Sequence, residues 1–174
     1  ITTFWGMASL ILPLLIFRAS DSASTAAFYA SVSLACAAGG QLLTGLLRDR
    51  YGRTQPLLVS STGIVVSALC LAFSTESVPL LFVFGTALTT TAWAVSTLVP
   101  ALIAEVATKA EKNRLVGLGH FVWSTAMVTG SLLGGWWVEI DPAIPFGFGA
   151  VSATIGTWCA WQLCRRLRNI ETPD

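Results

Sequence analysis

Long apolar stretches alternate with short polar ones along the whole of this 174-residue chain. A helix needs about 20 residues to cross ~30 Å of hydrocarbon, and the apolar stretches meet or approach that length. They lack the alternation of apolar and polar residues that is typical of strands in a membrane barrel. The pattern therefore predicts an all-α membrane protein with six transmembrane helices, the first one shortened, over residues 3–17, 26–47, 56–73, 79–104, 115–138 and 144–163.

The connections between these segments differ in charge. Residues 18–25, 74–78 and 139–143 contain one basic residue, Arg18, whereas residues 48–55, 105–114 and the tail contain nine. Short loops rich in Lys and Arg stay on the cytoplasmic side of a membrane. We therefore expect an integral, multi-pass protein of a bacterial-type inner (plasma) membrane, with both ends cytoplasmic. The nine residues are Arg48, Arg50, Arg53, Lys109, Lys112, Arg114, Arg165, Arg166 and Arg168.

The amino-acid composition is typical of a protein whose outer surface faces lipid. Charged residues make up 11% of the chain and hydrophobic residues 54%, with a mean hydropathy of +0.71, while soluble domains have about 25% charged residues. The net charge of +1 provides no basic excess for nucleic acid. The chain starts at Ile1 with apolar sequence and shows no signal-peptide pattern, so we expect a fragment or a trimmed chain.

Residues for enzymatic chemistry are scarce. The single His120 has no carboxylate or cysteine partner at a helical spacing within a span, and the four cysteines have no metal-ligand spacing with it. We expect no catalytic residues, no metal and no cofactor. No Asp, Glu, Lys or Arg lies mid-span, so this portion also shows no site for coupling to an ion.

One polar connection carries a motif. Residues 45–53 read Gly-Leu-Leu-Arg-Asp-Arg-Tyr-Gly-Arg, with Gly45, Asp49, Arg50, Gly52 and Arg53 at the fixed positions of the pattern G-x-x-x-D-[RK]-x-G-[RK]. This pattern resembles the signature between the second and third helices of a six-helix half in the major facilitator superfamily. The resemblance implies half of a carrier fold, a single domain over residues 1–174 built from two inverted three-helix repeats.

The resemblance also implies a cytoplasmic gate. In the family this connection holds the two halves together in the outward-open state, which assigns Asp49 and Arg53 to a gate, together with Glu105 and Arg114 beside the next cytoplasmic loop. Asp49 would face the positive end of a neighbouring helix dipole. The alternative is that these charges only set the topology.

The segment over residues 115–138 resembles the antiporter signature of the family, with Ala126 in place of a glycine and Ser131 in place of a proline. The missing proline leaves antiport weakly supported. Ala126, Gly130 and Gly134 recur every four residues and predict a smooth face for close helix packing.

The segment over residues 79–104 carries a mixed aromatic and hydroxyl stripe. Thr90, Trp93 and Thr97 share one face, and with Trp123 they are candidates for lining a solute cavity. Ordinary bonding of the hydroxyls to the preceding turn is the alternative interpretation.

The sequence therefore predicts a secondary active transporter that moves a small solute by alternating access between two six-helix halves. Its partners would be a small-molecule substrate, the lipid bilayer, and a second half in the same or another chain. A non-transporting receptor or assembly factor with the same fold is the alternative, and a membrane enzyme is disfavoured.

Overall fold

The computed structural model is a bundle of six helices. It describes residues 1–52, 54–106 and 108–171, and the side chains of these ranges except at 102–106, 109–110, 163 and 166–171. No strand occurs within the described ranges. The helices are α1 (Thr2–Ser20), α2 (Ala23–Tyr51), α3 (Thr54–Ala72), α4 (Val78–Val106), α5 (Lys109–Ile140) and α6 (Ile144–Glu171). The all-helical class predicted from the sequence is confirmed.

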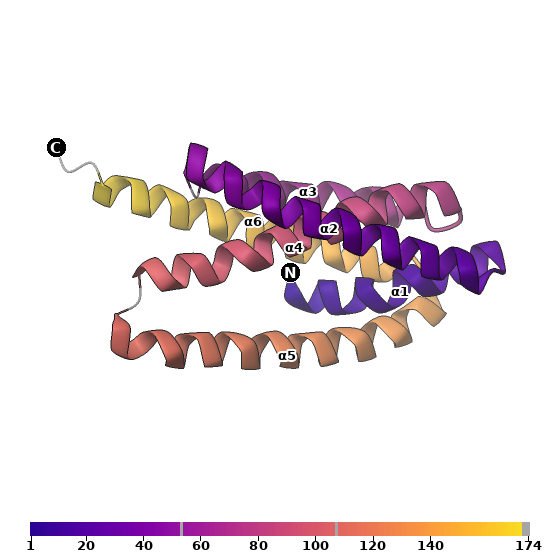
Figure 1. The fold of residues 1–174 in the computed structure, drawn as a ribbon. Coiled ribbons are helices and arrows are strands. Elements are labelled where there is room, and N and C mark those ends of the chain that lie inside the picture. The colour runs from indigo at the N-terminus through magenta and orange to yellow at the C-terminus, as the bar shows by residue number, and fades with distance from the viewer. Residues whose placement is uncertain (53, 107, 172–174) are drawn as a thin grey trace.

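The helices run alongside one another, and their connections alternate between the two ends of the bundle (Figure 1). The α1–α2, α3–α4 and α5–α6 connections lie at one end. The α2–α3 and α4–α5 connections lie at the other end, together with the C-terminal end of α6. We call these the α1–α2 end and the α2–α3 end. Helix α1 starts partway along the bundle (Figure 1).

The turns at the α1–α2 end are built by local polar chemistry. Asp21 follows α1 in the left-handed conformation, with φ of 47°. Ser22 then caps α2, because its Oγ accepts a hydrogen bond from the backbone N–H of Thr25 at 3.2 Å. A side-chain acceptor at this position satisfies one of the N–H groups that the first helical turn leaves without a partner.

The helices extend beyond the apolar segments, and this corrects the predicted connections. Residues 48–51, 105–106 and 139–140 were expected in connections but are helical. Hydropathy marks only the part of a helix that lies in hydrocarbon, whereas backbone hydrogen bonding continues into the headgroup region. The α1–α2 and α2–α3 connections consequently shrink to about two residues each.

Five helices have the length and composition of membrane spans within the described residues. They are Thr2–Ser20, Ala23–Tyr51, Thr54–Ala72, Val78–Ala101 and Glu111–Ile140. Helix α6, predicted as the sixth span, is not among the five. Its first and central turns include Gly147, Gly149, Thr154, Gly156 and Thr157, which dilute the apolar residues. It nevertheless packs along α3 and also touches α1.

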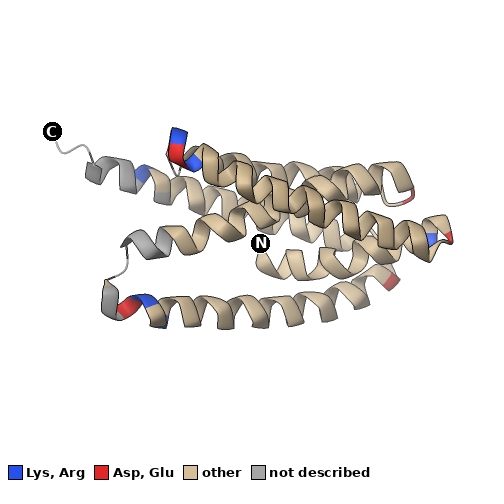
Figure 2. Ribbon diagram, in the orientation of Figure 1, with Lys and Arg blue, Asp and Glu red and all other residues tan. Residues whose placement is uncertain are grey.

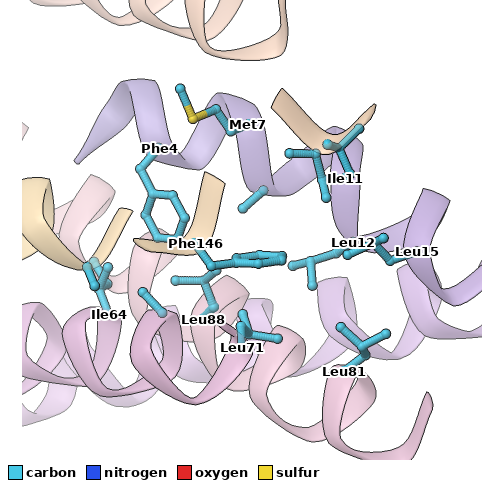
Figure 3. Packing of buried hydrophobic residues seen from close by; sticks show 14 of the residues in the cluster. Phe4, Met7, Ile11, Leu12, Leu15, Ile64, Leu71, Leu81, Leu88 and Phe146 are labelled. Carbon is cyan, nitrogen blue, oxygen red and sulfur yellow. The ribbon is translucent and has the colours of Figure 1, made fainter. Parts of the chain in front are cut away.

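The core is centred on α1. Its inward side chains meet those of α3, α4 and α6, while α2 and α5 contribute Tyr29 and Val138 (Figure 3). A second, smaller cluster forms at the α2–α3 end, where Leu57, Leu98 and Cys164 pack together. Ten residues of the main cluster labelled in Figure 3 are Phe4, Met7, Ile11, Leu12, Leu15, Ile64, Leu71, Leu81, Leu88 and Phe146.

Candidate functional site

The motif at residues 45–53 lies mostly on the last turns of α2. Arg48 and Arg50 occupy the final turn, where cations interact favourably with the negative end of the helix dipole. The Arg50 guanidinium lies over the Tyr51 ring, 5.4 Å from its centroid. The helix ends at Gly52, whose φ of 76° is a conformation that side-chain-bearing residues rarely adopt. Gly52 therefore allows the sharp reversal into α3.

The candidate gate residues are placed as follows. A Cβ added to Gly45 would meet no atom within 4 Å, so no described part of the chain packs closely on this glycine. Asp49 is exposed and has no ion-pair partner within the described residues. Arg114 is exposed on the first turns of α5. Arg53 and the side chain of Glu105 lie outside the described residues, so the gate role predicted for them stays a prediction.

Charges are confined to the two ends of the described bundle. Figure 2 shows Lys and Arg gathered at the α2–α3 end, whereas the opposite end is mainly acidic and the middle carries no charged residue. The acidic end includes Asp21, Glu76, Glu139 and Asp141. A charged group in the centre of a bilayer is costly, so this separation fits helices that cross a membrane.

The hydroxyls of the α4 stripe are bonded to their own helix. Thr90 Oγ1 donates to the carbonyl of Thr86 at 2.8 Å, and Thr97 Oγ1 donates to that of Ala94 at 2.8 Å. The Thr90 methyl also lies against α2, because a Cβ on Gly40 would come 2.5 Å from it. Thr90 therefore takes part in α2–α4 packing, while Thr97 is exposed.

The two candidate tryptophans differ in their surroundings. Trp93 is half-buried on α4, and its indole Nε1 is buried with no hydrogen-bond partner among the described residues. Buried polar groups are nearly always paired, so this donor is an exception. Trp123 lies on α5 and is 43% exposed.

The glycines of α5 lie against α1. A Cβ on Gly130 would overlap the carbonyl oxygen of Thr3, and one on Gly134 would come 3.0 Å from the Cα of Met7. Gly6 of α1 faces α5 in the same way, since a Cβ added to Gly6 would lie 2.7 Å from the carbonyl oxygen of Met127. These contacts bring two helix backbones together, as small residues do in membranes. Ala126, the third small residue of the predicted face, is half-buried.

Ser131 stands where the antiporter signature has a proline. Its Oγ donates to the carbonyl of Gly6 at 3.3 Å, which joins α5 to α1. The residue therefore contributes a contact between helices at the position where a proline would interrupt backbone bonding within α5.

Sequence reasoning missed two contacts. Ser33 of α2 and Thr86 of α4 share a hydrogen bond at 3.0 Å. At the α1–α2 end, Arg18 and Glu139 form an ion pair between α1 and α5. Their polar residue types were visible in the sequence, but their pairing depends on which helices are neighbours.

Together, the apolar spans, the charged ends and the uncharged interior define an integral, multi-pass α-helical membrane protein. The family model described as Major Facilitator Superfamily matches residues 1–172, and the chain belongs to that superfamily. The chain is also similar to the class H tetracycline resistance protein of Pasteurella multocida, with 29% identity over 154 residues. That alignment covers 86% of this chain but 38% of the relative, so the chain spans well under half of the relative's length.

Proposed function

We propose that this chain forms one six-helix half of a secondary active transporter that moves a small solute by alternating access. The observation that carries the proposal is the match to the major facilitator family over residues 1–172, which includes every helix from α1 to α6. Family membership favours transport over the receptor or assembly-factor alternative.

Two inverted repeats, α1–α3 and α4–α6, are supported by the packing pattern. If the two repeats are equivalent, α1 corresponds to α4, α2 to α5 and α3 to α6. The α1–α5 contact then corresponds to the α2–α4 contact, and the α3–α6 contact corresponds to itself. These three pairs are the most extensive helix contacts in the described bundle. Glycines mark both equivalent contacts, with Gly130 against α1 and Gly40 against α4.

A second six-helix half would cover the sides of α2 and α5 that this chain leaves open. Large apolar residues on both helices are exposed, including Leu42 at 74% and Leu132 at 71%. Such surface is stable against lipid or against another helical bundle. A second half in the same chain fits the relative's length, because this chain covers 38% of it. Another chain could supply it equally well.

The solute would enter between the halves and meet the polar side of α4. Trp93 is half-buried and Thr97 is exposed on the same helix face. The Trp93 indole N–H is buried and has no partner among the described residues, so binding of a solute there would have to uncover this donor. Aromatic surface with one or two polar groups suits an amphiphilic solute. The motif at the end of α2 would form the cytoplasmic gate, with Asp49 facing the other half.

A transport measurement tests the proposal, and tetracycline is a reasonable first probe because of the Pasteurella relative. Susceptible bacteria expressing the full-length protein should accumulate less probe than cells with an empty vector. Collapsing the ion gradients should abolish the difference, since secondary transport depends on them. Equal accumulation across a panel of amphiphilic antibiotics, with the protein verified in the membrane, would contradict the proposal.

A further inference from the structure

The outward side of α6 carries an apolar stripe that ends in a cation. Val151, Ile155, Trp158 and Trp161 are exposed, the two tryptophans by 58% and 41%, and Arg165 is exposed one turn beyond. Their spacings of three and four residues place them on one face of the helix. The fourteen helical steps from Val151 to Arg165 span ~21 Å, which is most of the way across a bilayer's hydrocarbon core.

The stripe ends in a cation–aromatic pair. The Arg165 guanidinium lies over the Trp161 ring, 4.7 Å from its centroid. This contact orients the guanidinium without pairing its N–H donors, which are the groups that bind phosphate in a bidentate manner. Arg165 has no carboxylate partner within the described part of the chain. The site thus presents an oriented cation at the end of an apolar path.

The pair is held in place by the core beneath it. Cys164, next to Arg165, is buried against Leu57 of α3 and Leu98 of α4. This fixes the end of α6 at the α2–α3 end, where Figure 2 shows the gathered basic residues. The basic end therefore favours an anionic partner over a neutral one.

We propose that this face of α6 binds an anionic phospholipid, with an acyl chain along Val151, Ile155 and Trp158 and the phosphate against Arg165. An amphiphile of this type matches the site, because it joins an apolar chain to an anion at headgroup depth. Tryptophans also favour that depth. The inference rests on the proposed orientation in one respect, since it places the site in the cytoplasmic leaflet.

The experiment measures lipid binding directly. The full-length protein is placed in nanodiscs of phosphatidylcholine with increasing phosphatidylglycerol, brominated on its acyl chains, and quenching of tryptophan fluorescence is recorded. Quenching should saturate with phosphatidylglycerol, and Arg165→Gln should weaken the apparent affinity about five- to tenfold. Brominated phosphatidylcholine, which has the same chains and phosphate but no net charge, should quench without saturating.

Two further variants test whether an effect of Arg165→Gln on lipid affinity is specific to this site. Trp161→Leu keeps the cation but removes the ring that orients it, so it should weaken saturation in the same direction even if Arg165→Gln does not fold. Lys112→Gln removes an equivalent charge from the start of α5, which Figure 2 shows apart from the end of α6, and should change affinity by less than about twofold because of screening.

The outcomes separate this inference from the transport proposal. Unchanged saturation in both the Arg165 and Trp161 variants, or equal behaviour of the two lipids, would overturn the lipid site and leave only nonspecific lipid contact. Neither result would alter solute transport by the same protein. Loss of transport with normal saturation would contradict the proposed function alone.

Discussion

Hydroxyl and indole side chains within the spans differ in how their hydrogen-bond donors are paired. Thr44, Thr89 and Thr91 each donate to a carbonyl one turn back on their own helix, as threonines in membrane helices commonly do. The indole N–H of Trp93 extends farther from the helix, so its partner must come from another element. The sequence could indicate that Trp93 shares a face with hydroxyls. It could not show that this donor lacks a partner, because the surroundings depend on tertiary packing.

Trp93→Phe tests that donor. The substitution keeps an aromatic ring but removes the N–H, so solute affinity should fall about three- to tenfold, the effect of losing one hydrogen bond. Stability should stay constant or rise slightly, because the substitution removes a buried donor that has no partner in the described part of the chain. Solute titration and thermal unfolding in detergent measure the two effects.

Trp136→Phe is the matched control, since Trp136 is 66% exposed on α5 and outside the proposed cavity. Equal affinity in the wild type and in both variants would remove Trp93 from the solute site.

At the scale of elements, the α1–α5 contact shows what a pattern can and cannot predict. The four-residue spacing of Ala126, Gly130 and Gly134 predicted a smooth face on α5. It did not identify α1 as the neighbour, and it gave no role to Gly6, because a single glycine in an apolar helix has no spacing to interpret. In the sequence Ser131 is only a departure from a signature, whereas in the structure it bonds to α1.

Gly130→Ala is predicted to destabilise the α1–α5 contact. The new methyl would overlap the backbone of Thr3, which cannot rotate away as a side chain can. Overpacking of this kind costs about 1–3 kcal/mol, so the apparent unfolding temperature should fall.

Gly135→Ala provides the matched comparison five residues along the same helix, where the nearest atom to a new Cβ is a Leu10 methyl carbon at 3.9 Å. Both changes raise helix propensity equally. Equal unfolding temperatures for the two variants would mean that α1 and α5 are not in such close contact.

For the whole molecule, the sequence predicted six helices and the grouping of their connections, although five of the six have the length and composition of a membrane span within the described residues. Charge was informative because the basic residues lie in alternate connections, and the structure brings these connections to one end (Figure 2). Helix lengths were underestimated because hydropathy does not register turns in the headgroup region. Which end faces the cytoplasm stays a prediction, since it depends on the membrane and not on contacts within the bundle.

Cysteine labelling tests the orientation. In the full-length protein without its native cysteines, Ser77→Cys in the α3–α4 connection should react with an impermeant reagent in intact cells. Lys112→Cys, at the other end of the bundle, should react only after the cells are opened. The reason is the excess of Lys and Arg at the α2–α3 end. Labelling of Lys112→Cys in intact cells would reverse the orientation.

The gate prediction also belongs to the whole molecule, because it concerns how two halves separate. Asp49 is exposed at the end of α2 beside the open space at Gly45, so its carboxylate is available to the other half. Contact with a helix N-terminus there would stabilise the outward-open state. A charge–dipole interaction of this kind shifts a balanced two-state equilibrium by about three- to tenfold.

Asp49→Asn keeps the shape of the side chain and removes its charge, so it should favour the inward-open state and slow transport by a similar factor. Solute affinity in detergent should change much less, because the gate lies far from the middle of the spans. Accessibility of cysteines at the cytoplasmic helix ends measures the equilibrium. Asp141→Asn, which removes a carboxylate charge at the opposite end and can still accept the Ala143 N–H, is the control. If Asp49→Asn leaves both accessibility and transport unchanged, the motif acts only as a topology signal, because its charges would then matter for insertion alone.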